Sequence, residues 1–203
     1  MIPLPDKKYD IIYADPPWKY YVVTKDSNIE WNHSAELLYD VMTVDEIKEL
    51  PVKSLSKKNC MLFLWCTFPC LQEGLDVIRS WGFKYKTLGF CWIKQSNGSC
   101  IPRQDGMGYY TRSNAEICLI GVKGKSLVRR HDIPSTITTP KTPHSKKPDE
   151  ARKRIIELCG DLPRIELFAR TKIHGWDVWG NDEKLNHEPL EAFSTLGDKR
   201  QDE

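Results

Sequence analysis

The sequence predicts an α/β fold with a mainly parallel central sheet. Short apolar segments that end abruptly, such as YDIIYA at 9–14 and CMLFLWC at 60–66, are typical of strands buried on both faces. Segments with apolar residues at helical spacing lie between such strands. This alternation is the pattern of proteins in which helices join parallel strands, and we expect an antiparallel pair late in the chain. The length of 203 residues suits one domain, which we place at 1–185, with a weakly ordered tail at 186–203.

Residues 1–82 contain two predicted strands and two predicted helices. The strand at 9–14 is ended by Asp-Pro-Pro, and a helix begins near Thr43, because Thr43 and Glu46 have the spacing of a capping box. The strand at 60–66 is followed by apolar residues at helical spacing, and Gly82 is the expected end of that second helix.

From residue 83 onward, the sequence predicts four strands and one helix. FKYKTLGFCWIK and AEICLIGV read as strands, and a helix follows with Pro148 at its first position and Gly160 after its end. RIELFA and WDVWG complete the strands. Residues 123–147 show no periodicity, so we expect a long functional or mobile loop there.

Composition restricts the class of protein. A content of 40% hydrophobic and 29% charged residues is typical of a globular chain. No segment is apolar for long enough to cross a bilayer, and the first residues lack a secretory signal, which predicts a cytoplasmic protein without a membrane partner. Seven cysteines without a regular framework indicate free thiols. Cys66 and Cys70 have no matching second pair, so we expect no metal site.

Charge alone does not identify a partner. The net charge is +2, but residues 123–154 are locally basic. This stretch is compatible with phosphate contacts and equally with a solvated loop followed by a helix face.

The tetrapeptide Asp15-Pro16-Pro17-Trp18 at the end of the first strand suggests a specific chemistry. Proline rings fix the backbone, so the Asp15 carboxylate and the Pro16 carbonyl become preset acceptors in a corner with few donors. Such a corner suits an NH₂ group, and Trp18 offers a face for an aromatic ring, which together describe an amino-substituted nucleobase. The alternative interpretation is a tight turn with a buried tryptophan.

The DPPW tetrapeptide resembles the signature of the adenine-N6 methyltransferase family that contains the catalytic subunit of the eukaryotic mRNA adenosine methyltransferase, together with bacterial and phage DNA enzymes. Further blocks follow in that family's order: MLFLWCT (61–67), EICLIGVKG (116–124), HSKKPDE (144–150), IELFAR (165–170) and WGN (179–181). The resemblance implies a Rossmann-like fold that uses S-adenosylmethionine as methyl donor, in the permuted order with the catalytic motif before the cofactor motif.

The resemblance also implies roles for single residues. In the catalytic corner, Asp15 and the Pro16 carbonyl would accept hydrogen bonds from the target amine, while Pro17 and Trp18 would form the wall beside the base. Lys147 would bind the donor's carboxylate. The other residues expected at the donor are Asp15, Arg170, Asn181 and Asp182, of which Arg170 and Asn181 would line the ribose.

Residues 19–33 are a candidate substrate loop. Its side chains Tyr20, Tyr21 and Trp31 could stack bases and Lys19 could contact phosphate, although the aromatic residues could equally serve packing. There is no G-x-G-x-x-G sequence.

We therefore expect an enzyme that methylates adenine N6 in nucleic acid, with DNA preferred and RNA also compatible. A homodimer or a partner subunit would fit as well. The alternatives are an inactive nucleic-acid-binding scaffold and a methyltransferase for another amine, such as cytosine N4 or a protein amide. An Asp15 that lay in a buried ion pair, or faced away from any cavity for the donor, would count against the enzyme.

Overall fold

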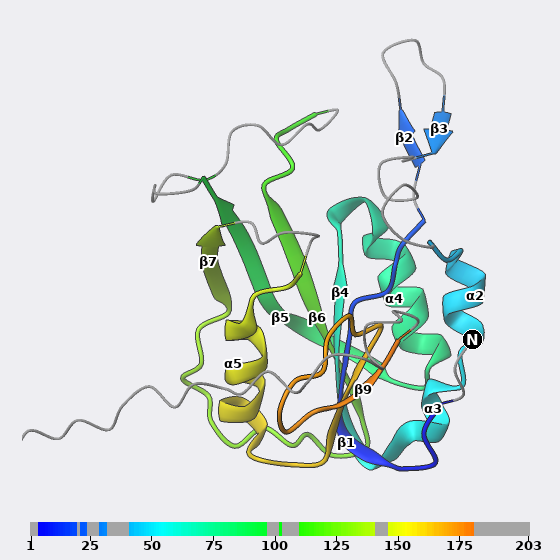
Figure 1. Cartoon of the computed structure of the whole chain (residues 1–203), viewed down its shortest axis with the longest axis vertical. Coiled ribbons are helices and arrows are strands. Elements are labelled where there is room, and N and C mark those ends of the chain that lie inside the picture. Colours follow the sequence, from blue (N-terminus) through cyan, green and yellow to red (C-terminus); the bar gives the residue numbers. More distant parts are fainter. Residues whose placement is uncertain are drawn as a thin grey trace, which may run out of the picture.

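The protein is built around one seven-stranded sheet with the order β7-β5-β6-β4-β1-β8-β9 (Figure 1). The computed structural model describes residues 4–19, 21–23, 29–31, 41–96, 102, 110–140 and 146–180. The strands of this sheet are β1 (Tyr9–Ala14), β4 (Ser56–Cys66), β5 (Lys84–Gln95), β6 (Ala115–Lys123), β7 (Thr136–Pro140), β8 (Arg164–Leu167) and β9 (Asp177–Trp179).

All of these strands except β6 run in one direction. β1 is parallel to β4 and β8, β8 is parallel to β9, and β5 is parallel to β7. β6 is antiparallel to both β4 and β5. The predicted α/β fold with a mostly parallel sheet is confirmed. The antiparallel pair expected late in the chain is not formed by β8 and β9, which are parallel; the reversed strand is β6, the third of seven in the sheet.

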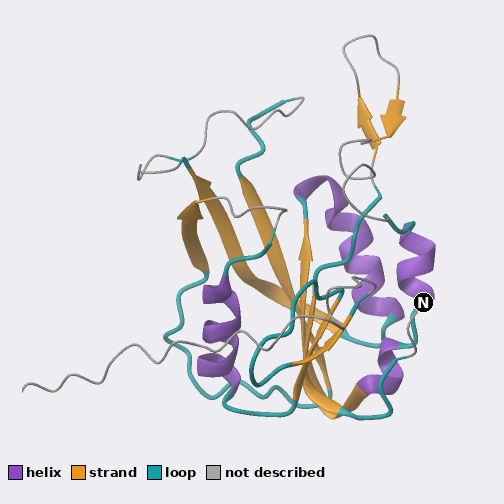
Figure 2. Ribbon diagram, viewed as in Figure 1, coloured by secondary structure: helices purple, strands orange, loops and turns teal. Residues whose placement is uncertain are grey.

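Helices cover both faces of the sheet (Figure 2). α2 (Val44–Glu49), α3 (Val52–Leu55) and α4 (Leu71–Ser80) lie on one face, and α5 (Asp149–Cys159) lies on the other (Figure 1). Each face has its own apolar cluster. Ile12 of β1 packs with α2, α3 and α4, whereas Ile11 packs with α5. Because successive side chains of a strand point to opposite faces, β1 is buried on both sides, as its sequence predicts.

The predicted helix signals are largely as expected. Thr43 Oγ1 accepts from the Glu46 backbone N–H at 3.3 Å and the Glu46 carboxylate accepts from the Thr43 N–H at 2.7 Å, which forms the complete capping box of α2. Gly82 and Gly160 follow α4 and α5 with φ of 83° and 89°, a conformation that glycine adopts without strain. Pro148 is at the N-cap of α5 and not at its first helical position, so the helix begins one residue later than predicted.

Two segments that the sequence suggested were loops contain strands. β7 lies inside 123–147 and pairs in parallel with β5 at the edge of the sheet. Within 19–33, β2 (Tyr21–Val23) and β3 (Ile29–Trp31) pair antiparallel, with Tyr21 opposite Trp31 in backbone register. The tail at 186–203 lies outside the described residues, so the predicted domain boundary stays a prediction. Among the helices of the described part, none is long and apolar enough to span a bilayer.

Candidate active site

Several chain segments converge where the parallel strands end. Ala14 pairs with Leu64 of β4 and Leu167 of β8, and Asp15 follows it directly. Because β6 is antiparallel, its amino-terminal end lies at this same edge, and Glu116 is opposite Trp92 near the carboxyl end of β5. Open α/β sheets place their ligand sites outside this edge.

The DPPW corner is held by hydrogen bonds to its neighbours. The Trp18 backbone N–H donates to the Pro16 carbonyl at 2.9 Å, and the Pro17 carbonyl accepts from the Met42 N–H at 2.9 Å. The Pro16 carbonyl retains a second lone pair for another donor. The corner therefore has a fixed shape before any substrate arrives.

Trp18 does not present the open stacking face that the sequence predicted. It is 6% exposed, and its indole Nε1–H donates to the Trp65 carbonyl at 2.9 Å. The ring packs in the cluster beneath the corner. For this side chain the structure shows the alternative, a tight turn with a buried tryptophan, and Trp18 ties the end of β1 to the end of β4. Pro17 remains half-buried beside the corner.

Asp15 lies in an ion pair, the arrangement that was expected to count against the enzyme. That criterion was wrong, because the Asp15 side chain stays partly exposed and its partner is a residue predicted at the donor. The Lys147 ammonium donates to Asp15 Oδ2 at 2.7 Å and lies 3.1 Å from Glu116 Oε2. The second oxygen of Glu116 accepts from the Lys94 ammonium. The Lys147 side chain is 8% exposed and that of Asp15 is 24% exposed. The partner of Asp15 is thus the lysine that the sequence assigned to the donor, so the two predicted site residues meet.

The neighbours of Asp15, Glu116 and Lys147 shift the pKa values of these three groups in different directions. Burial raises the pKa of Asp15, and Lys147 opposes this rise without reversing it, while the Glu116 carboxylate adds to it. Burial also acts to raise the pKa of Glu116, but Lys147 and Lys94 together leave that pKa below its usual value. Burial disfavours the charged form of Lys147, yet Asp15 and Glu116 hold its pKa above the ordinary range. Lys147 is therefore charged, and Asp15 is the more weakly held carboxylate.

A second buried ion pair fixes α5, the helix that follows Lys147. The Arg152 guanidinium donates two hydrogen bonds of 2.7 Å to the two carboxylate oxygens of Glu166 on β8. It also lies 5.4 Å from the centre of the Tyr13 ring, and the Tyr13 hydroxyl accepts from the Trp65 indole at 2.8 Å. The sequence analysis missed this pair, although a glutamate inside the apolar strand at 164–169 was a usable signal.

The two segments that were predicted to bind the cofactor, which follow β8 and β9, are in contact with each other. The Ala169 N–H donates to the Trp179 carbonyl at 3.0 Å, and a Cβ on Gly180 would lie 2.3 Å from the Ala169 carbonyl oxygen. Only glycine fits at Gly180 without a shift of the backbone. Arg170 is half-buried, and its charge acts to lower the pKa of Asp15. Asn181 and Asp182 lie outside the described residues.

The predicted substrate residues are only partly described. Lys19 is half-buried, and its N–H donates to the Met42 carbonyl at 3.1 Å. Tyr21 and Trp31 are described by their backbone alone, and Tyr20 lies outside the described residues. Their assignment to substrate therefore remains a prediction.

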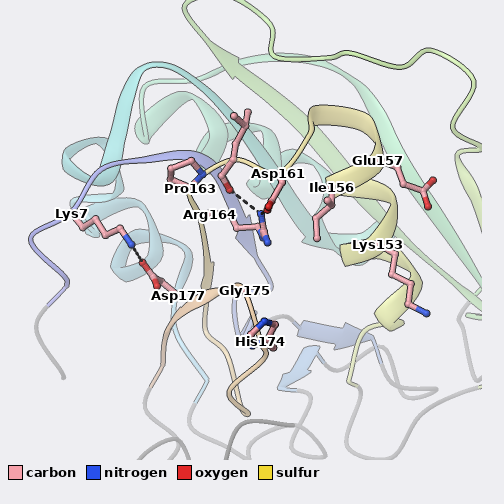
Figure 3. A pocket seen from close by; sticks show the side chains of 11 residues that line it. Lys7, Lys153, Ile156, Glu157, Asp161, Pro163, Arg164, His174, Gly175 and Asp177 are labelled. Atoms are coloured by element: carbon pink, nitrogen blue, oxygen red, sulfur yellow. Dashed lines mark hydrogen bonds and ion pairs between the residues drawn. The ribbon is translucent and has the colours of Figure 1, made fainter. Parts of the chain in front are cut away.

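A shallow cavity of about 710 Å³ lies away from this cluster (Figure 3). It opens at the amino end of β8 and is lined by Lys7, Asp161, Arg164 and Asp177, among others. Figure 3 shows these charged side chains paired with one another: Lys7 with Asp177 at 2.6 Å, and Arg164 with Asp161 at 2.6 Å. Lys153, Glu157 and His174 also line this cavity, which is at the opposite end of β8 from Asp15.

Metal binding has no support from the described side chains. Cys66 and Cys70 are buried free thiols, and burial raises the pKa of Cys66 to about 12. No group of three or more His, Cys, Asp or Glu side chains in the described ranges could hold a metal ion.

Comparisons with known proteins identify the family of this chain. The MT-A70 family model matches residues 9–182. The chain is 34% identical over 191 residues to the type II methyltransferase M.MunI of Mycoplasma sp, a match that spans 87% of this chain and 78% of M.MunI. It is 30% identical to a probable N(6)-adenosine-methyltransferase MT-A70-like protein of Oryza sativa subsp. japonica over 86% of this chain, and 28% identical to the N(6)-adenosine-methyltransferase catalytic subunit METTL3 of Homo sapiens over 80%. This chain spans only 23% and 26% of those two longer proteins. The family expected from DPPW and the blocks after it is confirmed: this chain belongs to the MT-A70 family of N6-adenine methyltransferases.

Proposed function

We propose that this protein transfers a methyl group from S-adenosylmethionine to the N6 amine of adenine in nucleic acid, and that DNA is its preferred substrate. Family membership supports the reaction. The preference for DNA is supported by the similarity to a type II methyltransferase, which covers 78% of that enzyme, whereas the adenosine methyltransferases from rice and human are covered by about a quarter. A cytoplasmic location suits this substrate and the buried free thiols.

The ion pair between Asp15 and Lys147 carries the proposal. The amino-acid end of S-adenosylmethionine has an ammonium and a carboxylate on one carbon. An anion and a cation 2.7 Å apart at the strand-end corner offer the complementary charges. Lys147 would bind the carboxylate through a charge-assisted hydrogen bond, and Asp15 would lie beside the ammonium. The described residues therefore fit the donor, which when bound supplies an electrophilic methyl group on its sulfonium.

The same corner suits an aromatic amine. The lone pair of the adenine amine is delocalised into its ring, so the amine is a weak nucleophile. Acceptors at Asp15 and the Pro16 carbonyl would bind its two hydrogens, draw electron density back to nitrogen and fix its direction of attack. Burial raises the pKa of Asp15, which suits this carboxylate to take up the proton that the methylated amine releases. A target base in a duplex would have to be flipped out to reach the corner.

The test combines product identification with two variants. Purified protein is incubated with labelled S-adenosylmethionine and either DNA or RNA, and the digested nucleosides are identified. We expect N6-methyldeoxyadenosine from DNA, with transfer abolished in Asp15→Ala. A labelled cytosine or protein would show methylation of another amine, and no labelled product would leave only a nucleic-acid-binding scaffold.

Donor binding is tested separately by calorimetry. Loss of one charge-assisted hydrogen bond weakens binding by roughly 10- to 100-fold, so Lys147→Ala should bind S-adenosylhomocysteine that much more weakly. Its affinity for 5′-methylthioadenosine, which has no carboxylate, should be unchanged. The neighbouring Lys146→Ala is the control for general loss of positive charge. Equal losses for both ligands would remove Lys147 from the carboxylate site.

A further inference from the structure

Glu116 and Lys94 form a buried pair directly behind the proposed donor site. Glu116 lies 3.1 Å from the Lys147 ammonium through one oxygen and accepts from Lys94 through the other. Their side chains are 12% and 14% exposed. Neither residue was predicted to have a role, although both lie in predicted strands and Glu116 begins the family block EICLIGVKG.

The four charges form a chain that runs from Lys94 through Glu116 and Lys147 to Asp15. Two carboxylates and two ammonium groups balance, which explains how so many charges tolerate burial. The two ends of the chain differ. Glu116 is held by two lysines, whereas Asp15 has Lys147 as its nearest cation and is more exposed. The contact that opens most readily is therefore the one between Lys147 and Asp15.

An ammonium has three N–H groups, and Asp15 and Glu116 account for two of those of Lys147. The third N–H is left for the donor carboxylate. Because Glu116 shares the Lys147 ammonium with Asp15, it weakens the hold of Lys147 on Asp15. Glu116 is placed to hold the lysine, because the strands β5 and β6 fix both Glu116 and Lys94 in register.

We propose that Glu116, held in place by Lys94, is a positioning residue that retains Lys147 at the donor site and keeps Asp15 available to the target amine. This inference rests on the proposed function, since it assigns a purpose to the contact between Lys147 and the donor. It adds a pair of residues that touch neither the donor nor the base and that set how tightly Asp15 and Lys147 bind each other.

Glu116 and Lys94 should have opposite effects on Asp15. Glu116→Gln keeps the shape of the side chain but removes its charge, so Lys147 turns to Asp15 and the pKa of Asp15 falls. Lys94→Gln leaves Glu116 with Lys147 alone, so Glu116 competes more strongly for that lysine and the pKa of Asp15 rises. Nearby charges of opposite sign alone give shifts of these signs, so the positioning role also requires the loss of donor affinity in Glu116→Gln described below.

The other groups around Asp15 do not obscure this titration. The groups that face it are Tyr13 on β1, Cys66 on β4, Glu116 and Cys118 on β6, Lys147 before α5 and Arg170 after β8. Burial raises the pKa of Tyr13, Cys66 and Cys118, so these three stay neutral where a carboxyl titrates. The pKa of Lys147 lies above its ordinary range, so this group stays charged. Glu116 is the remaining carboxyl, and the Glu116→Gln variant removes its own titration.

The experiment follows the carbon-13 carboxyl signal of Asp15 in the ligand-free full chain between about pH 3 and pH 9, with assignment from Asp15→Asn. We expect its midpoint to fall by roughly one pH unit in Glu116→Gln and to rise by a similar amount in Lys94→Gln. Glu157→Gln, which removes an exposed carboxylate near Arg130, should leave it unchanged. Shifts of the same sign in both variants, or no shift in either, would overturn the inference.

Donor binding gives a second measurement. Calorimetry should show that Glu116→Gln binds S-adenosylhomocysteine about 10-fold more weakly than the parent, and circular dichroism checks that the variant is folded. An affinity within 2-fold of the parent would contradict the role of Glu116.

Failure of the positioning role and failure of the proposed function give different results. If the parent protein methylates adenine but the titration and affinity do not change, only the positioning role is lost. If the titration shifts as expected but no nucleoside is methylated, the proposed function is lost.

Discussion

Removing the Lys147 charge should destabilise the fold by an amount that depends on pH. In Lys147→Met the apolar stem is retained, but Asp15 and Glu116 lose an ammonium at 2.7 and 3.1 Å. Breaking a buried ion pair by removal of one partner costs about 3–5 kcal/mol. The partial exposure of Asp15 and the remaining contact between Lys94 and Glu116 reduce this figure, so we expect about 2–4 kcal/mol at pH 7. For a chain of this size that lowers the melting temperature by about 5–15 °C.

The pH dependence follows from the direction of the pKa changes. Burial already raises the pKa of Asp15, and without Lys147 that pKa rises further, while the pKa of Glu116 loses part of what lowers it. A carboxyl whose pKa is higher in the folded state destabilises the fold at pH values above that pKa. The penalty disappears as the pH falls towards the pKa of the unfolded chain, near 4. The stability deficit of Lys147→Met should therefore shrink between pH 8 and pH 5.

Urea unfolding of the parent and variant at pH 5, 6, 7 and 8 measures this deficit. Lys146→Met is the matched control, because that side chain is more exposed and lies 3.6 Å from the exposed carboxylate of Asp149; its change should stay within about 0.5 kcal/mol. A deficit below about 1 kcal/mol at pH 7, or one that grows towards acidic pH, would refute the reasoning.

Two further predictions concern the ion pair that fixes α5 and the turn after β6, which lies at the edge of the sheet opposite Asp15. Arg152→Met leaves the buried Glu166 carboxylate unpaired and should lower the free energy of unfolding by about 3–5 kcal/mol. Adding Glu166→Gln should recover part of that loss in urea unfolding, and a double variant less stable than the single one would contradict the pairing. Gly124→Ala should cost at least about 2 kcal/mol, because φ is 67° and the new Cβ would lie 2.3 Å from the Lys58 carbonyl oxygen. Gly82→Ala, with φ of 83° but only a flexible lysine side chain at 3.3 Å, should cost less, as measured by urea unfolding of both variants.

The parts of the site that the sequence predicted are those with a local cause. An apolar run made β1 recognisable, two prolines marked its end, and the order of the family blocks pointed to Lys147. β7 was missed for an equally local reason. TITTP is short, polar and rich in threonine, and it lies at a sheet edge where only Ile137 is buried, so it reads as loop. The sequence also could not show which way the Trp18 ring turns, because both an open and a buried indole are compatible with DPPW.

The charge cluster around Lys147 could not be predicted because it depends on the direction of one strand. Glu116 is the second residue of β6, and the antiparallel pairing with β4 and β5 puts it at the same edge as Asp15 and Lys94. In a parallel β6 the amino-terminal end would lie at the other edge of the sheet, roughly 20 Å away at about 3.3 Å per residue. An apolar run such as AEICLIGV has the same pattern in either direction. The contact between Glu116 and Lys94 therefore depends on the topology of the whole sheet, which the local sequence around either residue does not determine.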